Sequence, residues 1–142
     1  MDDNQRIAEF LEAGPFAVAG ASNDPSKYGN KVVTSLVQAG FEVFPVNPRE
    51  ERIEDLVAYP DLASVPADPA PPRGVSIITP PAITERIVEQ AAAAGIPRVW
   101  MQPGAESEVA VARARELGLE VIAGGPCILV AVGNLRASRD TQ

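Results

Sequence analysis

The 142-residue sequence contains no histidine and only one cysteine, Cys127. Without histidine it has neither the Ser-His-Asp nor the Cys-His arrangement of nucleophilic catalysis, no histidine ligand for a metal and no phosphohistidine intermediate. A single cysteine forms no disulfide within the chain and cannot by itself supply a cysteine zinc or iron–sulfur site. What remains is carboxylate, lysine or thiol chemistry, or binding without chemistry, and a reducing cytoplasm fits best.

Long apolar runs and an excess of positive charge are also missing. No run approaches the roughly 18 residues of a membrane span, and the opening residues Met1-Asp2-Asp3-Asn4 lack the apolar core of a secretory signal. The net charge of −7 argues against a general role with nucleic acid or at a membrane surface, because both need a broad basic face. We therefore expect a cytoplasmic protein in which residues 1–142 form a single domain.

Short runs rich in β-branched and apolar residues recur along the chain. They are mostly apolar rather than alternating, which is typical of strands covered on both faces. Three helix-like stretches end in a glycine and pass at once into such a run, as repeated β-α-β units do. The sequence thus predicts an α/β protein with a doubly wound, mainly parallel five-stranded sheet and helices on both faces. The predicted strands are Phe16–Gly20, Phe41–Val46, Gly74–Thr79, Arg98–Gln102 and Leu119–Ala123.

Two segments depart from this rhythm. Residues 50–73 predict a loop-rich crossover on the surface, with a short helix around Ile53–Val57 and with Leu62–Val65 packed onto the core. Four prolines between positions 66 and 72 exclude regular structure in the rest of that segment. The chain after Asn134 is polar, and we expect it to fray.

The turn after the first predicted strand, Ala19–Gly29, is the most informative segment. Ligands of doubly wound sheets bind outside the carboxyl ends of the strands, at the point where the strand order reverses. This turn is rich in small residues and opens into an apolar helix, so its backbone N–H groups are left for an anion. Both lysines of the chain, Lys27 and Lys31, lie in the turn or at the start of that helix. The predicted phosphate cradle comprises Ala21 and Ser22, with Lys27 as a point charge.

This turn does not match the dinucleotide fingerprint G-x-G-x-x-G, because the glycine that follows Gly20 is Gly29. A plain connection between strand and helix is therefore the alternative interpretation.

The second predicted strand ends in Asn47-Pro48-Arg49. An NAD-binding domain usually places an acidic residue here for the ribose hydroxyls, whereas in this chain Glu50 and Glu51 follow only later. Arg49 suits an additional phosphate on the ribose, such as the 3′-phosphate of CoA or the 2′-phosphate of NADP. The alternative is that Asn47-Pro48 simply forms a turn.

Other strand ends supply further candidates. Thr79-Pro80 either starts a helix, with Thr79 near its N-cap, or forms a wall for an adenine ring. Met101 and Gln102 end the fourth predicted strand and are candidates to line the channel of an extended ligand. Cys127 is expected to be a buried structural thiol.

Together these residues resemble the CoA-binding protein family, small proteins similar to the N-terminal CoA-binding domain of the succinyl-CoA synthetase alpha subunit. The resemblance covers roughly residues 7 to 130. Its most specific part is Val18–Gly29 followed by Val43–Pro48, and weaker agreement comes from Pro80-Pro81, Trp100–Gly104 and Cys127. Small members often carry Asp-Arg-Cys where this chain has Gly125-Pro126-Cys127, which is closer to the Gly-Pro-Asn-Cys of the synthetase.

The resemblance implies a Rossmann-like fold with CoA or acyl-CoA as the ligand. It does not imply the ligase reaction, because the phosphohistidine of the synthetase belongs to another domain. The implied site residues are Gly20, Ala21, Ser22 and Lys27 for the phosphates, Asn47, Pro48, Arg49, Thr79 and Pro80 for the adenosine part, and Met101, Gln102 and Pro103 for the pantetheine arm. Tyr28 is a further cofactor-binding candidate.

Three hypotheses about function follow. The first is a non-catalytic CoA-binding or acyl-CoA-binding carrier, sensor or regulatory module, since the sequence offers no catalytic constellation. The second is an NADP-linked oxidoreductase, which Arg49 supports and the missing G-x-G-x-x-G opposes. The third is a CoA-binding subunit of a larger acyl-CoA ligase. In each case the expected ligand is a nucleotide, with a second copy of the chain or an enzyme subunit as a possible partner, and with no nucleic acid, membrane or metal.

Overall fold

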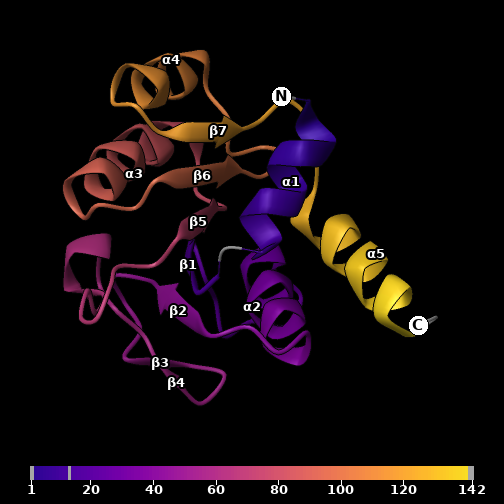
Figure 1. Ribbon diagram of the computed structural model, residues 1–142. Helices are drawn as coiled ribbons and strands as arrows, with labels where there is room; N and C mark the ends of the chain where they lie inside the picture. The colour runs from indigo at the N-terminus through magenta and orange to yellow at the C-terminus, as the bar shows by residue number, and fades with distance from the viewer. Residues whose placement is uncertain (1, 13, 141–142) are drawn as a thin grey trace.

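The computed structural model describes residues 2–12 and 14–140. Five parallel strands form one sheet in the order β2-β1-β5-β6-β7 (Figure 1). β1 pairs with β2 on one side and with β5 on the other, so the strand order reverses at β1. Each strand lies within its predicted range, which confirms the predicted sheet. The strands are β1 (Phe16–Ala19), β2 (Val43–Val46), β5 (Gly74–Ile77), β6 (Arg98–Met101) and β7 (Glu120–Ile122).

Helices cover both faces of the sheet, as the sequence predicts. α1 (Asp3–Glu12), α2 (Tyr28–Gln38) and α5 (Ile128–Asp140) lie on one face, and α3 (Pro81–Ala93) and α4 (Glu108–Glu116) lie on the other. The strands are buried between these two layers, and side chains along a strand point alternately to either face. In β1, Ala17 and Ala19 pack toward α3 and α4, whereas Phe16 and Val18 pack toward α1, α2 and α5.

The predicted helix around Ile53–Val57 is wrong. The chain forms an antiparallel hairpin there, in which β3 (Arg52–Ile53) pairs with β4 (Leu56–Val57). The turn residues Glu54 and Asp55 have φ of 50° and 66°. Two consecutive residues in the left-handed region break a helix and match the geometry of a two-residue hairpin turn.

The rest of the crossover contains one short 3-10 turn, η1 (Leu62–Ser64). The Asp61 carboxylate accepts a hydrogen bond from the Ser64 N–H and so caps the turn. Leu62 and Val65 are buried, which confirms their predicted packing onto the core.

The predicted fraying after Asn134 is also wrong, because α5 continues to Asp140. Ile128 and Val132 anchor the start of this helix in the core. Near its end, an Arg139 Nη1–H donates to the carbonyl oxygen of Ala39 over 2.8 Å, and the guanidinium lies 5.8 Å from the centre of the Phe41 ring. Ala39 follows α2, where helix carbonyls lack internal partners and attract cations. Arg139 thus fastens the end of α5 to the end of α2.

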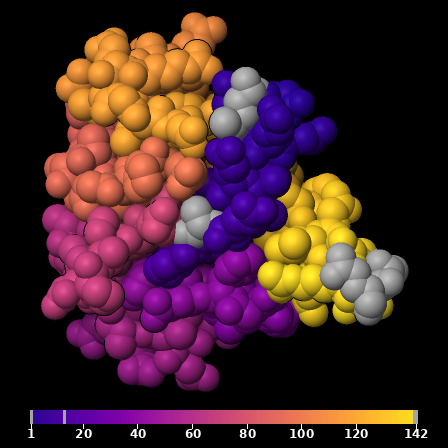
Figure 2. Space-filling model, viewed as in Figure 1, coloured from indigo at the N-terminus to yellow at the C-terminus, as the bar shows by residue number. Residues whose placement is uncertain are grey.

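Figure 2 shows α1 lying across one face of the molecule, with α5 beside it. Both helices belong to the layer that also contains α2. Within residues 2–12 and 14–140, no helix is long and apolar enough to cross a membrane.

Candidate functional site

A hollow with a volume of 390 Å³ opens at the carboxyl end of β1, where the strand order reverses. Its walls come from the turn after β1, the first residues of α2 and the ends of β2 and β5. Except for Gly29 and Ile78, every residue in these walls was assigned to the site from the sequence. The lining residues are Gly20, Ala21, Ser22, Lys27, Tyr28, Gly29, Asn47 and Ile78.

The backbone donors of this hollow differ from the expected ones at one position. Gly20 and Ala21 donate their N–H groups to the carbonyl oxygen of Val46, over 3.2 and 3.3 Å. The Ala21 N–H is therefore already bonded, although Ala21 lines the hollow. Among the hydrogen bonds of residues 14–140, none is donated by the N–H of Ser22, Tyr28 or Gly29. These three groups are the donors that an anion would find.

Polar side chains hold the loop before α2 in shape. The Asp24 Oδ1 accepts hydrogen bonds from the N–H and the hydroxyl of Ser26, over 2.9 and 2.7 Å. The Asp24 N–H in turn donates to the Ser22 hydroxyl over 3.0 Å. The two hydrogen bonds from Ser26 keep the pKa of the Asp24 carboxyl below its ordinary value, with a smaller contribution from the charge of Lys27.

Lys27 adds a positive charge to the same wall. It occupies the N-cap position of α2 in an extended conformation, and its side chain makes no capping hydrogen bond. An ammonium group beside unpaired N–H groups at a helix N-terminus favours a phosphate or a carboxylate. Lys31 is exposed one turn further along α2 and is not part of the lining.

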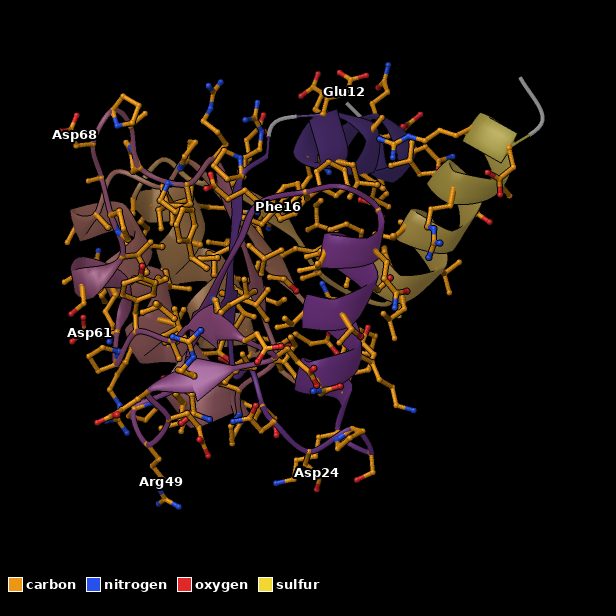
Figure 3. The ribbon with its side chains drawn as sticks, turned by 90° about the horizontal axis from the view of Figure 1, so that it is seen from below. Glu12, Phe16, Asp24, Arg49, Asp61 and Asp68 are labelled. Carbon is orange, nitrogen blue, oxygen red and sulfur yellow. The ribbon has the colours of Figure 1, made fainter. Side chains whose placement is uncertain are left out.

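Asn47 joins the end of β2 to the turn after β1. Its Nδ2 donates to the carbonyl oxygen of Ala21 over 2.9 Å, and its Oδ1 accepts from the Arg49 N–H over 2.8 Å. Asn47 therefore both forms a turn and shapes the hollow. Pro48 and Arg49 lie outside the lining and are exposed. Figure 3 shows Arg49 at the same end of the molecule as Asp24, with its side chain directed away from the protein.

The residues after β5 occupy the other side of the hollow. Ile78 forms the wall there, whereas Thr79 and Pro80 lie beyond it. Pro80, not Thr79, is at the N-cap of α3. The Thr79 hydroxyl lies 2.8 Å from the hydroxyl of Thr84 in the first turn of that helix, so Thr79 supports the helix from one residue before its cap.

Met101 and Gln102 lie away from the hollow surface. Both side chains are fully buried, and Met101 packs in the core beneath α3 and α4. The Gln102 Oε1 accepts hydrogen bonds from the Tyr28 hydroxyl over 3.2 Å and from the Ile128 N–H over 2.9 Å. Its Nε2 donates to the Ser76 hydroxyl. Gln102 therefore connects the first residues of α2 and α5, while Pro103 after it is exposed.

Tyr28 and Cys127 meet where α2 and α5 begin. The Tyr28 hydroxyl lies 2.7 Å from the Cys127 sulfur, which is half-buried rather than fully buried as expected. Burial, and then the contact with Cys127, raises the pKa of Tyr28 well above its ordinary value. The loop before Cys127 is fixed because the Trp100 indole N–H donates to the carbonyl oxygen of Pro126 over 3.0 Å.

The hairpin β3–β4 supports the loop between β1 and α2, and the sequence did not predict this support. The buried Asn30 donates both to the carbonyl oxygen of Ser22 over 2.9 Å and to the Glu54 carboxylate over 2.7 Å. The Asn23 side chain bonds to the carbonyl oxygen of Arg52 and to the Glu54 N–H. The turn residues Glu54-Asp55 are not among the Asn-Gly or Asp-Gly type pairs that mark a two-residue hairpin turn, so the sequence carried no clear signal of it.

Two solved structures resemble this one over most of the chain. A hypothetical protein from Pyrococcus horikoshii OT3 has a TM-score of 0.87 and 30% sequence identity, with 95% of this chain and 93% of that chain covered. A conserved hypothetical protein from Pyrococcus furiosus has a TM-score of 0.75 and 37% identity, covering 81% of this chain and 96% of that chain. The Rossmann-like α/β fold is thus shared with proteins of similar length.

Among curated proteins, the chain is similar to the ADP-forming acetate–CoA ligase II subunit alpha of Pyrococcus furiosus. The two are 40% identical over 60 residues, which are 42% of this chain and 13% of the ligase subunit. The chain therefore spans only a small part of that relative. The family model of the CoA binding domain matches residues 15–133, a range that includes every residue lining the hollow. The chain belongs to the CoA-binding domain family.

Proposed function

We propose that this protein binds CoA or an acyl-CoA, with the phosphates of the ligand in the hollow after β1. One observation carries the proposal. A single hollow of this CoA-binding domain is lined by Lys27 and by three residues whose N–H groups are unpaired, Ser22, Tyr28 and Gly29. A pyrophosphate placed there gains both a cation and helix N-terminal donors.

The remaining parts of the ligand are assigned from the neighbouring strand ends. The adenosine part lies over Asn47 and Pro48, where the exposed Arg49 reaches a 3′-phosphate. Thr79 and Pro80 border the adenosine from the β5 side. The pantetheine arm runs along the carboxyl ends of the strands past Pro103, above the buried side chains of Met101 and Gln102.

For the biological role, we propose a carrier, sensor or regulatory module. The alternative is a CoA-binding subunit that works with a separate catalytic chain of an acyl-CoA ligase, and the similarity to an acetate–CoA ligase subunit supports it. Purification of the native protein discriminates the two. A catalytic chain that co-purifies in constant ratio supports the subunit role, and a monomer or homodimer supports the independent module.

Isothermal titration with CoA, dephospho-CoA and NADPH tests the proposed ligand. We expect saturable binding of CoA, weaker binding of dephospho-CoA and no binding of NADPH. Native mass spectrometry of the protein as purified adds an independent measurement, since a retained ligand is identified by its mass. If CoA does not bind at millimolar concentration, the proposal is rejected, whereas binding of NADPH alone would favour an oxidoreductase.

A further inference from the structure

We propose that the groove between α1 and the start of α5 receives the acyl group of an acyl-CoA, and that this acyl group is short, apolar and uncharged. This inference rests on the proposed CoA-binding function and specifies what the thioester end of the ligand carries. The groove has a volume of 420 Å³ and lies beside the loop that follows β7. Figures 1 and 2 show α1 and the first part of α5 side by side.

The walls of this groove are apolar with an uncharged polar rim. Ile7 comes from α1, and Pro126, Val130 and Ala131 come from the loop before α5 and from α5 itself. Asn4 and Asn134 supply the polar groups, and no charged residue is among the described residues that line the groove. Such a surface suits a small hydrocarbon group. The complete lining is Asn4, Ile7, Gly125, Pro126, Cys127, Val130, Ala131 and Asn134.

One pair of side chains connects the groove to the phosphate site. Tyr28 lines the hollow after β1, Cys127 lines the groove, and the Tyr28 hydroxyl lies 2.7 Å from the Cys127 sulfur. α2 follows β1 and α5 follows β7 in a parallel sheet, so the starts of both helices lie at the carboxyl edge of the sheet. A ligand with its phosphates at Lys27 that extends along this edge past Tyr28 therefore reaches the groove.

The groove offers no partner for one class of acyl group. The carboxylate of a succinyl group placed against this apolar wall would find no basic side chain among the described residues that line it. Arg6 on α1 lies outside the lining, and its guanidinium nitrogen is 3.6 Å from the Asp3 carboxylate. The groove therefore favours groups such as isobutyryl over dicarboxylic acyl groups.

Val130 offers an accessible apolar contact in this groove. Its side chain is 63% exposed and is part of the lining. A second copy of the chain is the other occupant that such a surface admits. We favour the acyl group because Cys127 in the groove contacts Tyr28, which lines the hollow proposed for the phosphates.

The experiment compares the affinities of CoA, isobutyryl-CoA and succinyl-CoA by isothermal titration. We expect isobutyryl-CoA to bind about tenfold more tightly than CoA, since each methylene fully removed from water contributes up to about fourfold and the open groove leaves part of the group exposed. We expect succinyl-CoA to bind no more tightly than CoA. The variant Val130→Asp should lose the preference for isobutyryl-CoA and keep the affinity for CoA.

The matched control is Val109→Asp, because Val109 on α4 is 64% exposed and lies outside both sites. This control should retain the preference for isobutyryl-CoA. A gain-of-function variant, Asn134→Lys, should make succinyl-CoA bind more tightly than CoA.

If CoA binds but acyl groups make no difference, or if Val130→Asp keeps the preference, the inference is overturned while the CoA-binding function stands. If Val130→Asp only dissociates a dimer, a second copy occupies the groove. Absence of all CoA binding instead rejects the proposed function itself.

Discussion

Gly29, the second residue of α2, lies directly against the carbonyl oxygen of Gly20 at the end of β1. A Cβ atom added to Gly29 would overlap that oxygen. Gly20 has φ of 92°, and a Cβ added there would lie 2.7 Å from the carbonyl oxygen of Ile78. The ends of β1 and β5 and the start of α2 therefore approach as closely as glycine permits. This contact sets the free N–H groups of α2 beside the turn.

The variant Gly29→Ala should lower the free energy of unfolding by about 2–3 kcal/mol, because the overlap is with backbone and is relieved only by moving the turn or the helix. Urea denaturation monitored by circular dichroism measures the change. Gly133→Ala is the control, since a Cβ at this position of α5 meets no atom within 4 Å. We expect it to raise stability by about 0.5–1 kcal/mol. Equal stability of Gly29→Ala and the parent would disprove the close contact.

The variant Lys27→Ala should weaken CoA binding by about 10- to 100-fold, the range for one charge-assisted hydrogen bond to a phosphate. Thermal stability should stay unchanged, because the exposed Lys27 side chain makes no capping hydrogen bond. Lys31→Ala removes the same charge one turn away, outside the hollow, and should have a much smaller effect. Isothermal titration at two salt concentrations measures both variants. Equal losses for the two lysines would mean that only the net charge matters.

The variant Arg49→Ala should reduce discrimination between CoA and dephospho-CoA. If Arg49 contacts the 3′-phosphate, the parent should prefer CoA by about fivefold, as expected for an exposed ionic contact of roughly 1 kcal/mol. The variant should then bind the two ligands equally well. Arg52→Ala is the control, because this nearby guanidinium donates to the carbonyl oxygen of Asp55 within the hairpin. A preference for CoA that survives Arg49→Ala would assign the 3′-phosphate to another residue.

The sheet and its ligand edge were predictable because they depend on local signals. Apolar runs identify buried parallel strands, and the glycine after each of α2, α3 and α4 identifies where the next strand follows. The turn after β1 borders a hollow at the sheet edge that these rules indicate, with Gly20, Ser22 and Lys27 in its lining. The connection rule for parallel strands then fixes the edge at which the ligand site lies.

The missed features depend on contacts between distant parts of the chain. The two short strands of the hairpin, β3 and β4, comprise four residues, which are too few to show the alternating pattern of a strand. Glu54 in its turn is held by hydrogen bonds to Asn23 and Asn30, which are far away in sequence. The Ala21 N–H was expected to be free, but it is bonded to Val46 from another strand. Gln102 looked like a ligand contact because it ends a strand, and its full burial is a tertiary effect.

The variant Asn30→Ala should destabilise the protein and weaken CoA binding together. It leaves the carbonyl oxygen of Ser22 and the Glu54 carboxylate without their buried donor, which should cost about 1–3 kcal/mol. Thr34→Ala on the same helix is the control, since among the described residues the Thr34 hydroxyl bonds only to the carbonyl oxygen of Lys31 in that helix. It should change stability by less than about 0.5 kcal/mol. If Asn30→Ala lowers stability but CoA affinity is retained, the hairpin supports the fold and not the site.

The variant Tyr28→Phe should remove part of the decrease in stability at alkaline pH. The pKa of Tyr28 is raised in the folded protein, first by burial and then by the contact with Cys127. In the unfolded chain the phenol ionises near its ordinary pKa of about 10. Above that pH the unfolded state therefore releases this proton while the folded state keeps it. The free energy of unfolding should then fall by up to about 1 kcal/mol per pH unit as the pH rises.

Urea denaturation of the parent and of Tyr28→Phe between pH 8 and pH 11 measures this difference. Below pH 10 the two curves should be parallel, with the parent more stable by about 1 kcal/mol from the hydroxyl contacts with Gln102 and Cys127. Above pH 10 they should converge, because only the parent carries the raised pKa. Cys127→Ala should lessen the convergence without abolishing it, since burial is the larger cause of the shift. Curves that stay parallel up to pH 11 would show that Tyr28 ionises equally in both states.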